Sequence, residues 1–87
     1  MIYLVSYDLN TPGKNYQRLI DAICSYKGYC KALKSQWFVC SDKSAHEIGA
    51  HLKSYIDEND WLLVCEFTGN QSGWLAEEVV DWLKTVF

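Results

Sequence analysis

Two segments of this chain are apolar at both odd and even positions, and this feature limits the possible folds most. Residues 61–67 read WLLVCEF, and residues 1–10 read MIYLVSYDLN. Alternate residues of a strand point to opposite faces of a sheet, so both faces of these strands are apolar. An antiparallel sheet with one face in water alternates apolar with polar residues. We therefore predict that both faces are covered, the second by a further helix or by a second copy of the chain, and we favour a homodimer.

The segment between these two strands begins with a helix and a hairpin. The loop TPGK ends the first strand, and residues 15–26 then carry apolar side chains at the spacing of an amphipathic helix that ends near Gly28. Residues 29–33 and 36–41 have the composition of two strands. Only two residues separate them, so they must form an antiparallel hairpin.

Two more helices are predicted from capping and from periodicity. Ser44 and Glu47 have the spacing of a capping box, and an amphipathic pattern follows them up to the acidic turn DEND at 57–60. After the loop TGNQSG, an apolar stripe and a polar stripe alternate from Gly73 onward. This pattern predicts a third helix over residues 73–86.

The order of these elements indicates an α+β fold of the ferredoxin-like βαββαβ type. In that arrangement a four-stranded antiparallel sheet has two helices on one face, because right-handed crossovers place both helices on the same side. The third helix is an addition at the C-terminal end. A chain of 87 residues has room for one domain, which we take as 1–87, with a core unit at 1–67 and the added helix at 73–86.

Composition limits the class of protein further. No apolar run approaches the roughly 18 residues that span a bilayer, and an acid stands where a signal peptide has its small residues. We expect a cytoplasmic protein with no membrane partner. The four cysteines, Cys24, Cys30, Cys40 and Cys65, show neither a CxxC pair nor zinc spacing. We expect them to be buried free thiols.

The net charge of −3 is unevenly distributed along the chain. Residues 1–43 hold six basic and three acidic side chains, whereas residues 44–87 hold two basic and eight acidic ones. The acidic half argues against broad contact with a phosphate backbone, while the basic half is able to form a local patch. Solvated faces with no partner explain the same pattern.

Asp8 is the strongest candidate for a functional residue. It is a carboxylate at the end of an apolar strand beside a Pro-Gly loop, with Asn10 on the same strand face. Mg²⁺ takes oxygen ligands and often needs only one or two protein carboxylates. Two copies of Asp8 near the axis of a dimer would therefore be able to share one ion. The alternative is that Asp8 accepts backbone N–H bonds from the TPGK turn.

Other residue types offer weaker candidates. Lys14 and Arg18 follow the Asp8 loop and are best placed to meet a phosphate, although solvated helix residues have the same pattern. His46 and His51 are five residues apart on one helix, which is the wrong spacing to bind one ion together, and we expect surface positions. The four tryptophans are more typical of core or dimer packing than of base stacking.

Three segments together resemble a known family. They are the opening strand IYLVSYDLN, the hairpin LKSQWFV with Ser35 and Trp37, and the capped helix SAHEIGAHLKSYID. This pattern is similar to the small CRISPR-associated adaptation proteins of the Cas-two family and to their VapD-type toxin relatives. The shared features are a first strand that ends in a Tyr-Asp-apolar motif, here Tyr7-Asp8-Leu9, and a later strand that starts with a Ser. The resemblance covers about residues 1–67; the final strand of the family is replaced here by a helical pattern.

The resemblance implies a ferredoxin-like homodimer with Asp8 of each chain near the two-fold axis. In some members this pair supports cleavage of RNA or DNA with Mg²⁺ or Mn²⁺, which makes Asp8 the expected catalytic residue and metal ligand. Asn10, Lys14, Arg18, Ser35 and Trp37 are then expected to contact the substrate. In other members the protein is a structural bridge in a larger complex. A non-catalytic protein-interaction or structural module of a nucleic-acid-processing or defence complex is therefore the alternative.

Overall fold

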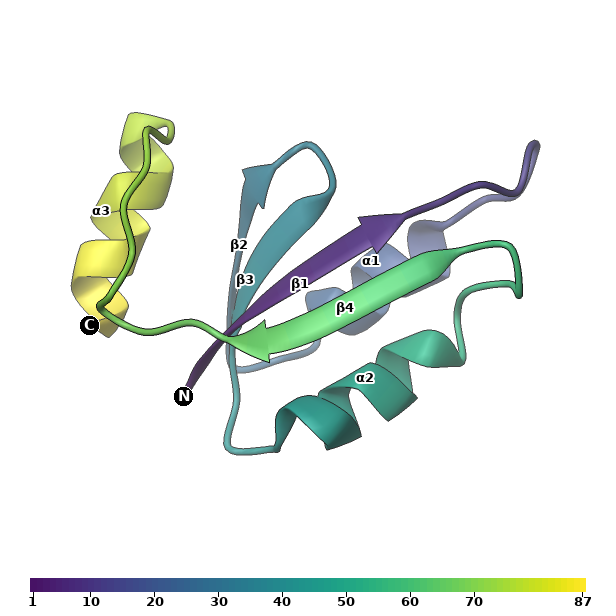
Figure 1. The fold of residues 1–87 in the computed structure, drawn as a ribbon, viewed down its shortest axis with the longest axis horizontal. Helices are drawn as coiled ribbons and strands as arrows, with labels where there is room; N and C mark the ends of the chain where they lie inside the picture. Colours follow the sequence, from purple (N-terminus) through teal and green to yellow (C-terminus); the bar gives the residue numbers. More distant parts are fainter.

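The chain folds into one sheet with helices packed on both of its faces (Figure 1). The computed structural model describes residues 1–87. The elements are β1 (Ile2–Asp8), α1 (Gln17–Ile23), β2 (Gly28–Leu33), β3 (Gln36–Cys40), α2 (Ala45–Lys53), β4 (Trp61–Glu66) and α3 (Glu77–Val86). This order confirms the predicted sequence of strands and helices.

The sheet has the strand order β2-β3-β1-β4, and all neighbouring strands are antiparallel. β1 is central, with Val5 opposite Trp37 of β3 and opposite Val64 of β4. β2 and β3 form the predicted hairpin around Lys34 and Ser35. The fold is therefore an α+β fold of the ferredoxin-like type, as the sequence predicts.

One face of the sheet packs against α1 and α2. Val5 and Val39 of the sheet, Leu19 of α1, and Ile48 and Leu52 of α2 are all completely buried in one cluster. Full burial of a side chain of this size stabilises the folded state by about 1.5–3 kcal/mol. This cluster fixes which strand residues point toward the two helices: the odd-numbered positions of β1 and β3.

The even-numbered positions of β1 and β3 face α3. Ile2 and Phe38 form a second buried cluster with Val79 and Leu83 of α3. The ring of Trp82 stacks on Phe38 with a centroid distance of 6.2 Å. Figure 1 shows α3 apart from α1 and α2, on the β2 side of the sheet, which it contacts. The sequence predicts a further helix or a second copy of the chain as the cover of this face. The helix α3 covers part of it.

α3 does not reach across the whole second face. Trp61 and Leu63 of β4 are 68% and 62% exposed, and Cys65 on the same face of that strand is also exposed. We refer to these three residues as the β4 row. All four cysteines are free, as predicted, but none is fully buried: Cys24, Cys30 and Cys40 are partly buried, and Cys65, which belongs to this row, is exposed.

The helix ends agree with the sequence where a cap is present. The predicted capping box of α2 is present, with the Ser44 hydroxyl accepting from the Glu47 N–H and the Glu47 carboxylate accepting from the Ser44 N–H, both at 3.1 Å. α1 and α3 have no side-chain cap, and both start later than predicted, at Gln17 and Glu77. Helix α1 also ends earlier than predicted, at Ile23, and is followed by turns and bends at residues 24–27. No helix has the length and apolar character that a bilayer crossing requires.

Candidate functional site

Asp8 is the last residue of β1 and lies exposed opposite Trp61 of β4. Its even number places it on the second face of the sheet, together with Ser6. Its backbone carbonyl accepts from Nδ2 of Asn10 at 3.2 Å, whereas its carboxylate has no hydrogen bond or ion pair within the chain. The carboxylate is therefore available for a partner outside this chain.

Asn10 has a structural role next to Asp8. Its backbone N–H donates to Oδ1 of Asp60 at 2.7 Å, and its Nδ2 donates to the carbonyl of Asn59 at 3.1 Å as well as to that of Asp8. These bonds connect the end of β1 to the turn before β4. The side-chain N–H groups of Asn10 are thus engaged with the backbone.

Lys14 and Arg18 are not brought to Asp8. The Nζ atom of Lys14 pairs with Oδ1 of Asp57 at 2.7 Å and lies 5.4 Å from the ring centroid of Tyr16. Arg18 is exposed on α1, which packs against the opposite face of the sheet from Asp8. Neither of these two cations therefore forms an ion pair with the Asp8 carboxylate.

Ser35 and Trp37 also lie away from the Asp8 side chain. Ser35 is exposed in the β2–β3 turn, and its carbonyl accepts from the N–H of Tyr7 at 3.1 Å. Trp37 is buried on the face that α1 and α2 cover, and its Nε1 donates to the Tyr7 hydroxyl at 3.1 Å. Trp37 is thus a core residue on the opposite face from Asp8.

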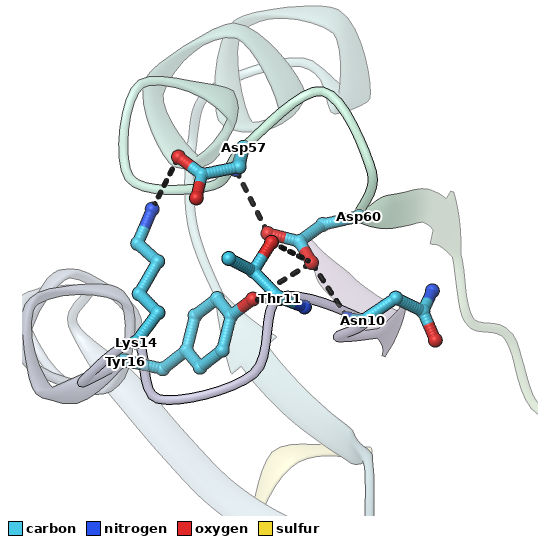
Figure 2. A network of polar contacts seen from close by, with 6 residues as sticks. All are labelled: Asn10, Thr11, Lys14, Tyr16, Asp57 and Asp60. Atoms are coloured by element: carbon cyan, nitrogen blue, oxygen red, sulfur yellow. Dashed lines mark hydrogen bonds and ion pairs between the residues drawn. The ribbon is translucent and has the colours of Figure 1, made fainter.

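A second carboxylate, Asp60, organises the loops around the end of β1 (Figure 2). Its Oδ1 atom accepts from the Asn10 N–H at 2.7 Å, the Tyr16 hydroxyl at 2.7 Å and the Thr11 hydroxyl at 3.4 Å. Its Oδ2 atom accepts from the Asp57 N–H at 2.8 Å. Asp60 is one of only two polar residues in the buried set.

These hydrogen bonds determine the charge state of Asp60. Desolvation by burial raises the pKa of its carboxyl, but the four hydrogen bonds favour the ionised form and together lower the pKa to about 2. The ionised carboxylate holds the β1–α1 loop against the turn before β4. Asp60 therefore performs the loop-holding role that the sequence offered as the alternative role of Asp8.

The histidines are placed differently from each other. His46 is exposed, as expected. His51 is half-buried, contrary to the expected surface position, and its Nδ1 is hydrogen-bonded to the Tyr26 hydroxyl at 2.7 Å. This contact joins α2 to the turn that follows α1 and engages one ring nitrogen of His51.

The residues of one chain do not form a metal site. No three His, Cys, Asp or Glu side chains lie close enough together to hold an ion. Asp8 contributes one carboxylate, and a second molecule that supplies further oxygen ligands would add to the one or two carboxylates that Mg²⁺ commonly takes besides water. The exposed β4 row beside Asp8 is apolar and offers a surface for such a molecule.

Comparison with known proteins identifies no relative: no protein-family model, curated protein or solved structure matches the chain. Any proposal for its function therefore rests on the positions of the residues.

Proposed function

We propose that this chain acts as a homodimer in which a second copy covers the β4 row, and that the two Asp8 carboxylates at this interface bind one Mg²⁺ or Mn²⁺ ion. The bound ion would support hydrolysis of phosphodiester bonds in RNA or DNA. One observation carries the proposal: Asp8 and the exposed Trp61 are direct register partners, on the sheet face that α3 leaves open.

The first step is the dimer. The β4 row leaves Trp61 and Leu63 in water, and removing apolar surface from water is favourable by about 25 cal/mol per Å². A two-fold dimer brings the same row of both copies together, because its interface is self-complementary. A stable interface buries about 800 Å² on each partner, so the contact must extend from the row along β1 toward Asp8.

The second step is the shared ion. A two-fold axis near Trp61 brings two Asp8 carboxylates toward each other, and each is free of intramolecular partners. Like charges at close range repel, and a divalent cation between them removes this repulsion. Such an ion would polarise a phosphoryl oxygen of the substrate and make a bound water more acidic. Asp8 would hold the ion, and the apolar row would limit access of bulk water.

Sedimentation equilibrium tests the dimer. We expect a mass of about twice the 10.1 kDa of one chain, and a single-chain mass for Leu63→Glu, which places a charge in the β4 row. Thr68→Glu is the matched control, because it adds the same charge in the exposed loop after β4. A wild-type chain that sediments as a monomer at high concentration would remove the dimer and the shared ion.

A cleavage assay tests the chemistry. Short RNA and duplex DNA are incubated with the wild type and with Asp8→Asn, in Mg²⁺, in Mn²⁺ and in EDTA. We expect metal-dependent cleavage that Asp8→Asn slows by about 10²- to 10³-fold, the usual effect of removing one charge-stabilising group. Asp81→Asn, an exposed carboxylate on α3, is the matched control and should retain full activity. Equal rates for wild type and Asp8→Asn, or no cleavage by either, would remove the catalytic part.

A second candidate function is a non-catalytic protein-interaction or structural module of a nucleic-acid-processing or defence complex. The observation that favours it is that Asp8 belongs to no group of three or more His, Cys, Asp or Glu side chains able to hold a metal ion. In that case the β4 row alone carries the function. A specific partner that is bound by Asp8→Asn, and not by Leu63→Glu, would support this candidate over the nuclease.

A further inference from the structure

A groove of about 660 Å³ lies between the second sheet face and α3. Its lining comes from the sheet, from the segment between β4 and α3, and from α3 itself, and ten of its sixteen lining residues are hydrophobic. Neither Asp8 nor Trp61 is among them. The groove is therefore separate from the proposed metal site, and a ligand in the groove does not depend on the nuclease function.

The walls of the groove contain apolar side chains that the chain leaves wholly or partly exposed to solvent. Trp74 is 95% exposed, and Leu33 and Phe87 are about half exposed. Contiguous apolar surface of this kind marks binding sites on soluble proteins. The volume also lies within the range of about 300–1,000 Å³ that is typical of small-molecule sites.

The charge of the groove is distinctive. Lys84 is the only charged side chain among the lining residues, and its ammonium group forms no ion pair. The acidic side chains of α3, Glu77, Glu78 and Asp81, are not part of the lining. The apolar groove thus has one positively charged side chain at its wall, although residues 44–87 are strongly acidic overall.

We infer that the groove binds a linear amphipathic anion, with an aliphatic chain against the sheet and α3 and a carboxylate at the Lys84 ammonium. The sheet floor, which includes Leu4 and Phe38, supplies apolar contact along the chain of the ligand. Trp74, which is 95% exposed and lines the groove, adds a further apolar surface for the ligand. The single cation selects one anionic group and disfavours a cationic head.

Titration with decanoate, below the concentration at which it forms micelles, tests this inference. Binding is followed by calorimetry and by tryptophan fluorescence, because Trp74 lines the groove. We expect saturable binding of one decanoate per chain. 1-Decanol serves as the uncharged probe of the same chain length, and decyltrimethylammonium as the cationic one.

Two variants separate the charge from the apolar channel. Lys84→Gln should weaken decanoate binding about two- to fivefold, the usual effect of one partly exposed ion pair, and leave decanol binding unchanged. Lys53→Gln, an exposed lysine on α2 outside the groove, is the control and should change neither. Val80→Glu introduces a carboxylate at a partly exposed position of the groove wall and should abolish binding of decanoate.

Three outcomes would overturn the inference. The first is the absence of saturable decanoate binding. The second is an equal effect of Lys84→Gln and Lys53→Gln, or tighter binding of the cationic probe. The third is that the wild type is a dimer, that Val80→Glu dissociates this dimer and that decanoate leaves it intact. This result would identify the groove as an interface between copies of the chain.

Discussion

Shortening Leu83 to alanine measures how strongly α3 is packed on the second sheet face. Leu83 is 8% exposed and belongs to the cluster with Ile2, Phe38 and Val79. Replacing a buried Leu by Ala lowers the free energy of unfolding by roughly 2–5 kcal/mol in well-packed cores. Leu83 also lines the open groove, so little closed cavity would remain, and alanine is the better helix former. We therefore expect the low end, a loss of about 2 kcal/mol in the free energy of unfolding.

Urea unfolding followed by circular dichroism gives this number. A loss of about 2 kcal/mol corresponds to a fall in Tm of roughly 8–16 °C for a domain of this size. The control is Val80→Ala, one turn away on the same helix at 36% exposure, which should change stability by less than about 0.5 kcal/mol. Equal effects of the two substitutions would refute the packing of α3. Two separate transitions would show instead that α3 unfolds independently of the sheet.

Three further predictions concern the loop network, the helix cap and the β4 row. The pKa of Asp60 is about 2 in the folded chain and about 3.9 in an unfolded chain. The carboxylate therefore contributes its full stabilisation above about pH 4 and loses it as the pH falls from about 4 to about 2. Asp60→Asn should therefore have a lower Tm than the wild type at pH 7, and this difference should shrink across the same pH window; a constant difference would contradict the assigned hydrogen bonds. Ser44→Ala removes the cap of α2 and should lower the free energy of unfolding by about 1 kcal/mol in urea titration, whereas the exposed Ser72→Ala should have no effect. Cys65 should react with a thiol reagent faster in monomeric Leu63→Glu than in the dimer that we propose, and equal rates would place the interface elsewhere.

The sequence predicted the elements of the core well because their signals are local. The apolar character of both strand faces, the two-residue gap at Lys34 and Ser35, and the capping box at Ser44 each depend on residues close together in the chain. The starts of α1 and α3 were predicted less well. Neither N-cap residue makes a side-chain cap bond, and the one local side-chain bond, from the N–H of Gln17 to Oδ1 of Asn15 at 2.9 Å, lies at the start of α1.

The surroundings of Asp8 could not be predicted in the same way, because they depend on contacts between distant segments. Asp60 accepts from Asn10, fifty residues away, and Lys14 pairs with Asp57, forty-three residues away. Nothing in the local pattern of the DEND turn distinguishes Asp60 from its acidic neighbours. The position of Trp37 was within reach, since its pairing opposite Val5 places it on the helix-covered face, but this requires the register of β3 on β1.

The two proposals concern the same incompletely covered sheet face, but they concern different parts of it. α3 packs on the β2 side of that face, so the apolar surface that stays exposed is divided between the β4 row and the groove beside α3. A charge at Leu63 and a charge at Val80 therefore test different surfaces of one molecule. If Leu63→Glu dissociates the dimer and still binds decanoate, the two surfaces act independently. If either substitution removes both properties, a second copy must occupy the groove and the β4 row together, and one interface then explains why both surfaces are exposed in a single chain.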